Sequence, residues 1–477
     1  MNQLIIYGAP KDAVRNDDFA VYVREPGKAW QELFVYEAKV DMHDVRSASM
    51  AYFDMEGEME VRIESRKQPV HRVDIRPLSY HVKFSYDEYA VKFTLNQPRK
   101  LSIEINGDRF TNLHLFANPC EQDAPLPEDN GIQLIRPGIH RTEDLLGLLE
   151  RPNGSTERKT LYFAPGMHYI EETVLRIPSH TTVYIAGGAI VVGSLVCDHV
   201  QDVVIRGRGI LYLSDFHRFS AFRGVRIIFS RNIDVEGITV LDPPHYSIYL
   251  GKSEQVRIRN FKSFSTRGWS DGIDMMACTD IEIDDVFLRT SDDCIAIYGS
   301  RWDYRGDSGR IRVRNAVLWA DVAHPLMMGT HGDHCGNGNT LYDVRFEDID
   351  ILEHHEPQVN YMGAMAINAG DKNTIRDISY KNIRVEDFEL GRLIDVRVMQ
   401  NRDYNPAPGN RIENITFEDI RYQGTCSNPS RIFGYDAERT VSGVRFTRLR
   451  INDRLILQPE EGLLELNDFS NQITFDI

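Results

Sequence analysis

Three aspartates and one histidine have the side chains that acid–base chemistry needs, and all lie within residues 268–330. Asp271 stands in a Ser-Asp-Gly sequence, and Asp292 and Asp293 are adjacent. His324 follows 31 residues after the second of the pair. A protonated carboxyl group and carboxylates held together can give and take protons at a reacting bond. These four residues are therefore the candidate catalytic centre, on the condition that the fold brings them together.

The composition is typical of a soluble folded protein. Of the 477 residues, 42% are hydrophobic and 26% are charged, and the length predicts two domains or an elongated repeat protein. The net charge of −16 argues against nucleic acid and anionic membranes as partners, and mildly against a strongly polyanionic substrate. No apolar stretch approaches the roughly 18 residues of a membrane span.

The N-terminus and the cysteines favour a cytoplasmic protein. The opening MNQLIIYGAPKDAVRNDD lacks the basic start and long apolar core of a signal peptide, although a secreted protein trimmed of its signal would look the same. The six cysteines form no Cys-x-x-Cys pair, which predicts neither a zinc site nor a disulfide framework. His331 and His334 lack a third spaced ligand, so we expect no metal and no cofactor.

The first third of the chain predicts a β-sandwich and a connection to a second domain. Residues 1–118 contain short runs that alternate apolar and polar side chains, such as MEVRIES and YHVKFSY, separated by turn-rich breaks. Residues 119–159 are predicted to be a linker with a capping helix over TEDLLGLLER, of which Thr142 is the expected N-cap.

Residues 160–477 contain a degenerate repeat that predicts a right-handed parallel β-helix. Its template is aliphatic-x-aliphatic/aromatic-x-Asn/Asp-aliphatic, and six of eight copies have Asn or Asp at the fifth position. Two strands around a polar turn are typical of one β-helix coil, because Asn and Asp tolerate left-handed backbone. The predicted fold class is all-β, a sandwich followed by this helix. The copies start 23–37 residues apart, at Ile233, Val256, Ile281, Ile311, Val344, Ile378, Ile415 and Val444.

A parallel β-helix would bring the four candidate residues to one groove. Asp271 and the pair 292–293 are 21–22 residues apart, close to one coil, and His324 lies another coil further on. Neighbouring coils stack about 4.8 Å apart. With side-chain reach, we expect the carboxylates to be separated by the roughly 6.5–9.5 Å that lets an inverting glycoside hydrolase fit a water molecule. Packing like charges together raises at least one pKa and keeps that acid protonated.

Three segments resemble motifs of glycoside hydrolase family 28, the polygalacturonases. Ser-Asp-Gly-Ile-Asp at 270–274 resembles the family's Asn-Thr-Asp-Gly motif. Asp-Asp-Cys at 292–294 is similar to its Asp-Asp-Cys segment, and Ala-His-Pro at 323–325 to its Gly-His-Gly segment. The leading sandwich is more similar to the dextranase relatives in family 49.

This resemblance implies a role for each of the four residues. Asp292 would be the general acid, Asp271 and Asp293 would activate water, and His324 would be the supporting histidine. The reaction would be a single displacement with inversion at an O-glycosidic bond of an oligo- or polysaccharide.

The sequence leaves open whether the substrate is a uronate or a neutral glycan. The family's Arg-Ile-Lys segment, which grips the galacturonate carboxylate, should fall near residues 363–370, where this chain has GAMAINAG without a basic residue. Arg392 and Arg397, one coil later, could supply the guanidinium instead, and a solvated strand charge is an equally open interpretation of Arg397. Five further residues on loops at the same edge are candidates for sugar binding: Trp269, Trp302, Tyr304, His331 and Tyr361.

Two other functions are compatible with this fold. A polysaccharide lyase needs a calcium-binding acid cluster with an Arg or Lys base beside it, and no such base lies in obvious register. A carbohydrate-binding β-helix would keep the fold without turnover. Each alternative has a glycan as its partner, and a homo-oligomer is compatible with all of them.

Overall fold

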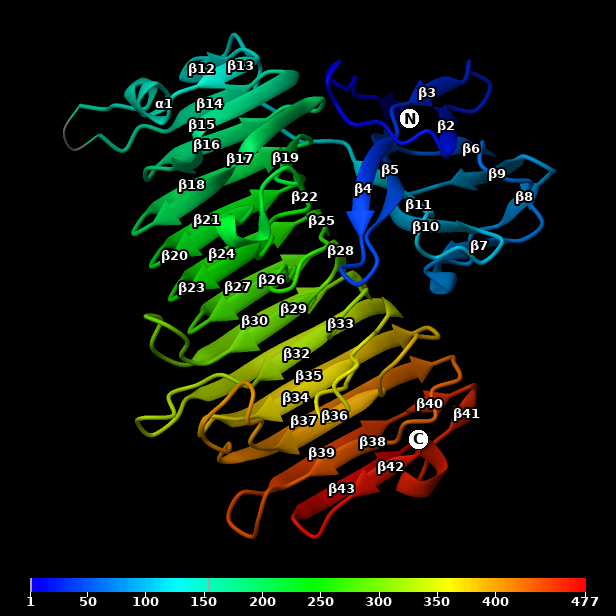
Figure 1. Cartoon of the computed structure of the whole chain (residues 1–477), viewed down its shortest axis with the longest axis vertical. Helices are drawn as coiled ribbons and strands as arrows, with labels where there is room; N and C mark the ends of the chain where they lie inside the picture. The colour runs from blue at the N-terminus through cyan, green and yellow to red at the C-terminus, as the bar shows by residue number, and fades with distance from the viewer. Residues whose placement is uncertain (1, 153–154) are drawn as a thin grey trace.

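The computed structural model describes residues 2–152 and 155–477, and it consists almost entirely of β-strands (Figure 1). An N-terminal sandwich lies beside the N-terminal half of a long right-handed parallel β-helix, which confirms the predicted fold class. In the described residues, no helix has the length and apolar character needed to cross a membrane.

The sandwich consists of two mainly antiparallel sheets around its own core. Alternating side chains such as Val21, Val23, Val61 and Ile63 point inward, as the period of two in the sequence predicts. One sheet contains β1 (Gln3–Ile5), β4 (Tyr36–Val40), β5 (Arg46–Glu56), β7 (Val73–Arg76), β10 (Arg99–Ile105) and β11 (Leu113–Pro119). The other contains β2 (Phe19–Arg24), β3 (Gln31–Leu33), β6 (Met59–Ser65), β8 (Phe84–Tyr86) and β9 (Ala90–Leu95).

The β-helix has three faces, each a stack of parallel strands. The cleft face contains β20 (Val225–Ile228), β23 (Ile248–Gly251), β26 (Ile273–Met276), β29 (Ile295–Tyr298), β32 (Leu326–Gly329), β34 (Met365–Ala369), β36 (Ile394–Val398), β38 (Ser430–Phe433) and β42 (Leu464–Leu466). The outer face contains β12 (Ile132–Ile135), β14 (Lys159–Phe163), β16 (Thr181–Ile185), β18 (Gln201–Gly207), β21 (Arg231–Glu236), β24 (Glu254–Arg259), β27 (Thr279–Asp284), β30 (Ser308–Arg314), β39 (Val441–Thr447) and β43 (Ser470–Asp476).

The third, sandwich face packs against the N-terminal domain. It contains β13 (Gly138–His140), β19 (Ile210–Tyr212), β22 (Thr239–Leu241), β25 (Lys262–Phe264), β28 (Phe287–Thr290), β31 (Val317–Ala320) and β40 (Arg450–Ile451), which pairs with β41 (Arg454–Leu455). Five longer strands continue from one face to the next: β15 (Gly166–Arg176), β17 (Ala189–Asp198), β33 (Thr340–Glu353), β35 (Thr374–Val385) and β37 (Arg411–Tyr422).

The polar fifth residue of the repeat forms the bend between the outer face and the sandwich face. The six Asn and Asp residues at this position all have left-handed backbone, with φ between 48° and 57°: Asn260, Asp285, Asn315, Asp348, Asn382 and Asp419. Their side chains form only a partial ladder. Asn382 Nδ2 donates to Asp348 Oδ1, but Asn315 Nδ2 donates to Asp284 Oδ1 at 2.7 Å, one residue out of line. Asp accepts but cannot donate, so mixed copies interrupt the ladder.

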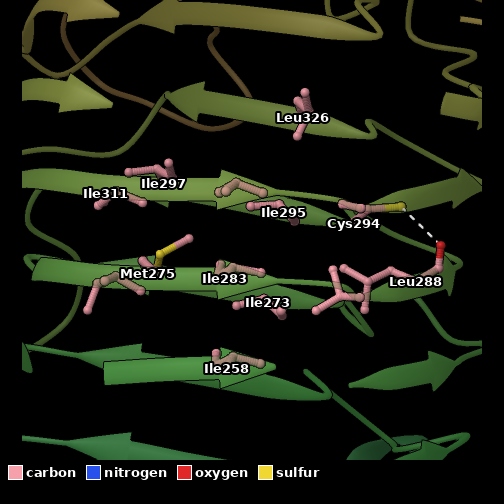
Figure 2. Packing of buried hydrophobic residues seen from close by; sticks show 14 of the residues in the cluster. Ile258, Ile273, Met275, Ile283, Leu288, Cys294, Ile295, Ile297, Ile311 and Leu326 are labelled. Atoms are coloured by element: carbon pink, nitrogen blue, oxygen red, sulfur yellow. Dashed lines mark hydrogen bonds between the residues drawn. The ribbon is translucent and has the colours of Figure 1, made fainter. Parts of the chain in front are cut away.

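The interior of the β-helix is a continuous column of aliphatic and aromatic side chains. Figure 2 shows Ile273, Ile295 and Leu326, which lie on successive cleft-face strands, stacked one above another. The aromatic third position of the repeat forms a second column, in which neighbouring rings lie 4.8–5.0 Å apart and nearly parallel: Phe346, Tyr380, Phe417, Phe446 and Phe475. This spacing matches the coil pitch, so the column holds successive coils in register.

The N-terminal end of the column is closed within residues 119–159, where the structure differs from the prediction. Strands β12 and β13 already pair with β14 and β15, so the ladder starts at Ile132 and not at residue 160. Both strands are short and half-exposed, and they therefore carry no periodic signal. Helix α1 (Thr142–Leu148) contributes Leu145 to the core, but its N-cap is Arg141, which makes no side-chain cap hydrogen bond. Thr142 lies inside the helix, and its Oγ1 donates to Glu172 Oε2 at 2.5 Å.

The two domains share a buried interface that contains both aromatic and charged side chains. Phe116 of the sandwich packs against Phe264 and Phe287 of the sandwich face. Arg289 and Asp321, both 0% exposed, form an ion pair at 3.0 Å next to the sandwich. The docking of the domains therefore depends on contacts that neither could satisfy alone.

Candidate active site

Asp271, Asp293 and His324 occupy the same position in three successive coils. Each lies just before a cleft-face strand, β26, β29 or β32. Backbone hydrogen bonds fix the register: Gly272 N donates to Asp293 O at 2.9 Å, and Cys294 N donates to His324 O at 2.8 Å. Because these residues are about one coil apart in the sequence, they form a column along one edge of the cleft face, as predicted.

Asp292 lies one residue earlier and accepts two backbone hydrogen bonds. Its Oδ2 accepts from Trp269 N at 2.8 Å, and its Oδ1 accepts from Asp293 N at 2.9 Å. Burial, and then the negative charge of Asp293, raise the pKa of Asp292 from 3.8 to about 7. At neutral pH this carboxyl group carries a proton in a large fraction of molecules, as a general acid requires.

Asp293 accepts hydrogen bonds from two neighbouring side chains. Its Oδ1 accepts from His324 Nδ1 at 2.6 Å, and its Oδ2 accepts from the Tyr298 hydroxyl at 3.2 Å. The other ring nitrogen of His324, Nε2, faces Tyr361 O, so both ring nitrogens meet an acceptor. Burial is the largest single influence on His324 and lowers its pKa, but the charge and hydrogen bond of Asp293, the charge of Glu356 and the contact with Tyr361 O together raise the value to about 9. An imidazolium therefore faces Asp293 at neutral pH.

The acidic side chains converge on one point. One oxygen each from Asp271, Asp292 and Asp293 lies within 4.8 Å of the others. This distance joins single oxygen atoms, whereas the predicted 6.5–9.5 Å separates whole carboxyl groups. Burial, followed by the charges of neighbouring aspartates, raises the pKa of Asp271 well above its usual value.

Asp274 belongs to this group, although the sequence analysis did not include it among the candidate catalytic residues. It lies within β26, is 0% exposed, and neither of its carboxyl oxygens has a hydrogen-bond partner. Burial, and next the charge of Asp293, raise its pKa well above the usual value, and Arg301 opposes this shift. The alternation within β26 could have identified it, because Ile273 points into the core and the next residue must point out.

The two tryptophans predicted to bind sugar are exposed beside the acids. Trp269 is 52% exposed and Trp302 is 46% exposed. The Arg218 guanidinium lies 4.3 Å from the Trp269 ring, and Arg301 lies 4.6 Å from the Trp302 ring. Both indoles keep a large accessible surface, as a sugar-stacking residue needs.

Tyr304 and Tyr361 do not fit their predicted role as sugar-stacking residues on open loops. Tyr304 is 5% exposed, and its hydroxyl lies 3.0 Å from that of Tyr249. Tyr361 is 7% exposed, its hydroxyl lies 2.9 Å from Thr330 Oγ1, and Tyr404 stacks on its ring at 4.8 Å. Both rings are packed against neighbouring side chains of the cleft face, so they support the site and do not offer a surface for stacking on a sugar.

His331 and Arg397 lie on the cleft face in settings that the sequence did not indicate. The His331 ring meets the Tyr298 ring edge-on at 5.0 Å, and burial together with Arg301 lowers its pKa to about 3, which leaves it neutral. Arg397 is engaged within the protein: it pairs with Asp395 at 2.7 Å and donates to Asn360 O at 2.5 Å. Arg397 is therefore not the free guanidinium that would replace the missing Arg-Ile-Lys segment.

The three catalytic candidates also have the composition of a cation site. Within the described residues, Asp271, Asp292 and Asp293 form the group of ligating side chains close enough to hold a metal ion. Carboxylates suit Ca²⁺ or Mg²⁺, but a raised pKa for Asp292 weakens such a site at neutral pH.

The fold and the site together define a right-handed parallel β-helix protein with a cluster of acidic side chains on one face. The sequence profile of Glycosyl hydrolases family 28 matches residues 220–452, a stretch that contains all four candidate catalytic residues. This match confirms the resemblance found in the sequence motifs.

Individual relatives include both polygalacturonases and dextranases. Exopolygalacturonase B of Aspergillus niger is 23% identical over 247 residues, covering 46% of this chain and 53% of that protein. A dextranase of Arthrobacter sp. (strain CB-8) is 22% identical over 337 residues, covering 57% of this chain and 49% of that protein. The chain thus spans about half the length of these relatives.

A solved structure matches both domains. Dex49A from Penicillium minioluteum is similar over 98% of this chain and 96% of its own, with a TM-score of 0.65 and 16% sequence identity. The similarity establishes a shared fold for the sandwich and the β-helix together.

Proposed function

We propose that the protein is an inverting glycoside hydrolase that cleaves O-glycosidic bonds of an oligo- or polysaccharide. The observation that carries this proposal is a pair of adjacent carboxyl groups in different surroundings. Burial and the charge of Asp293 raise the pKa of Asp292 to about 7, so that it holds a proton near neutral pH, while Asp293 accepts a hydrogen bond from the His324 imidazolium at 2.6 Å. In glycosidases, the surroundings of two carboxyl groups decide which of them acts as the acid and which as the base.

The proposed reaction is a single displacement by water. Asp292 donates its proton to the glycosidic oxygen as the bond from that oxygen to the anomeric carbon breaks. Asp271 and Asp293 hold a water molecule between adjacent coils, and one of them accepts its proton as the water attacks the same carbon. The spacing of the carboxyl groups does not by itself select inversion. The stereochemistry is supported by the similarity to family 28.

Replacing the acids one at a time tests this proposal. Asp292→Asn and Asp271→Asn are each expected to lower kcat by about 10²–10⁴, the usual contribution of a general acid or base. Turnover is measured on neutral and acidic glycans, and NMR of the first product identifies its anomer. Asp234→Asn is the matched control, because Asp234 lies on the outer face in an ion pair with Arg257. Near-normal turnover in both active-site variants would reject the hydrolase.

The same experiment separates the two alternative functions. A lyase would release an unsaturated product and would lose activity with a chelator, since its acid cluster would hold calcium. A carbohydrate-binding β-helix would bind glycans without any product. The proposed hydrolase gives a saturated product and keeps its activity in the presence of the chelator.

A further inference from the structure

The loop between β33 and β34 places a second histidine beside His324. His354 is 0% exposed, and its ring centre lies 5.9 Å from that of His324. Both of its ring nitrogens have a backbone partner: Nδ1 lies 2.8 Å from Ala323 O, and Gly363 N donates to Nε2 at 3.1 Å. A buried imidazole with two backbone partners joins the segments that carry them.

The two partners fix the protonation state of the His354 ring. The amide of Gly363 can only donate, so Nε2 is an acceptor and carries no proton. The carbonyl of Ala323 can only accept, so Nδ1 carries the proton and donates it. Burial, followed by the charge of His324, lowers the pKa of His354 well below its ordinary value, in agreement with a neutral ring. His354 is therefore one defined tautomer that bridges two backbone segments.

These two segments hold His324 from both sides. Ala323 directly precedes His324, so its bond to His354 holds the backbone from which the His324 side chain projects. Gly363 follows Tyr361 by two residues, and Tyr361 O is the acceptor that faces His324 Nε2. One buried ring thus controls both the backbone of His324 and the position of a carbonyl that its side chain contacts.

The loop that carries His354 is anchored at its base. His354 N donates to Glu353 Oε1 at 3.1 Å, and Glu353 Oε2 forms an ion pair with Arg109 of the sandwich at 2.7 Å. On the other side, a Cβ atom added to Gly391 would lie only 2.1 Å from His354 Cδ2. The ring is enclosed by its neighbours, so it has little room to move.

We propose that His354 is a positioning residue, which sets the hydrogen bond between His324 and Asp293 by holding the backbone on both sides of the His324 ring. This inference rests on the proposed function, in which Asp293 helps to activate water. Both ring nitrogens of His354 are occupied by backbone groups, so the residue acts through His324 and not on the substrate. A small displacement of a catalytic group lowers the rate of reaction strongly, which makes such support necessary.

Three substitutions of His354 remove its contacts separately and together. His354→Asn places an amide where Nδ1 lies and keeps a donor for Ala323 O, whereas His354→Gln reaches the position of Nε2 and keeps an acceptor for Gly363 N. His354→Leu removes both contacts. We expect kcat to fall about tenfold or more in His354→Leu and by less in the other two variants. KM should change less than about threefold in all three, because His354 does not touch the substrate.

Proton NMR separates positioning from a loss of stability. The Nδ1–H of His324 lies in a 2.6 Å contact with Asp293, so we expect a downfield resonance that exchanges slowly with water. In His354→Leu this proton should exchange faster or its resonance should disappear. Thermal unfolding of the same proteins measures stability. His355→Asn is the matched control and should change neither the resonance nor kcat, because its ring faces Glu389 at 3.2 Å.

The outcomes distinguish this inference from the proposed function. A His354→Leu protein that unfolds at a lower temperature but keeps the His324 resonance and kcat would overturn the inference. Loss of the resonance in a folded variant, when wild-type protein hydrolyses no glycan, would support positioning of His324 and reject the hydrolase. If His354→Leu does not fold, the other two variants decide. Wild-type kcat and an unchanged resonance in both His354→Asn and His354→Gln would overturn the inference.

Discussion

The protonation of Asp292 links the activity to pH. Its pKa of about 7 means that the acid is protonated below pH 7 and loses its proton above it. We therefore predict that kcat/KM falls as the pH rises through about 7, because the general acid is lost. A pH profile of kcat/KM reports the pKa of the free enzyme and measures this limb. A rate that stays constant from pH 6 to pH 9 would contradict the role of Asp292.

Two neighbours of Asp292 should move its pKa in opposite directions. The charge of Asp293 raises it, so Asp293→Asn is expected to lower the pKa of Asp292. The His324 imidazolium lowers it, so His324→Gln is expected to raise that pKa. Carbon-13 NMR titration of the Asp292 carboxyl carbon reports both shifts without requiring turnover. Shifts in the same direction would show that the charges do not act as described.

The raised pKa of Asp292 predicts that ionisation of this residue lowers the free energy of unfolding of the protein. Because the pKa of Asp292 is higher in the folded protein than its ordinary 3.8, wild-type protein loses stability as the pH rises from about 4 to 7. Asp292→Asn removes this cost. A pKa raised from 3.8 to about 7 implies that the variant exceeds wild type by up to about 4 kcal/mol in the free energy of unfolding at pH 8, with no difference at pH 3. Denaturant unfolding at both pH values measures this, and an equally large gain at pH 3 would point to another cause.

At the scale of elements, the stacking of coils leaves no room beside Asp271. A Cβ atom on Gly272 would lie 2.4 Å from Cys294 O in the next coil, so Gly272→Ala must displace backbone. We expect a loss of about 1–3 kcal/mol in stability and at least a tenfold loss in kcat, because Asp271 moves relative to Asp293.

A second glycine provides the control for this substitution. Gly147 in α1 has no atom within 4 Å of the added Cβ, so Gly147→Ala is expected to leave kcat unchanged and to raise helix stability by up to about 1 kcal/mol. Thermal unfolding and turnover of both variants check the pair. Equal effects at the two positions would show that coil contact does not position the acids.

At the scale of the whole molecule, the sandwich contributes to the position of the acids. Met42 N in the β4–β5 loop donates to Ser291 Oγ at 3.0 Å, and Ser291 directly precedes Asp292. Arg289 lies in β28, two residues before Ser291. It pairs with Asp321 and donates to Asn112 Oδ1 of the sandwich at 2.9 Å. The turn that carries the acid pair is thus held by both domains.

Removal of the buried guanidinium should therefore affect the whole molecule. Arg289→Met leaves Asp321 buried without its partner and is expected to cost about 3–5 kcal/mol in the free energy of unfolding. Adding Asp321→Asn should recover part of this loss, because the unpaired charge is removed. Arg310→Met, in an exposed pair with Asp280, is the control and should have little effect. A loss no larger than in the control would show that the interface pair is dispensable.

Much of the fold could be predicted from the sequence because its signals are local and repeat. The polar fifth position of the repeat marks a bend with left-handed backbone, and the coil-length spacing aligned Asp271, Asp293 and His324. Short half-exposed strands such as β12 lack that periodicity and were predicted as linker.

The sequence by itself determined the coil, the handedness of its bends and the column of catalytic candidates, because each depends on residue type and spacing along one chain. Only the tertiary structure decided which aromatic residues are exposed, how close the acids are, and that Asp274 joins them. Those features depend on how loops fold back and how side chains of different coils pack and share charge. Distances and pKa values of this kind arise between residues far apart in the sequence, and no local pattern records them.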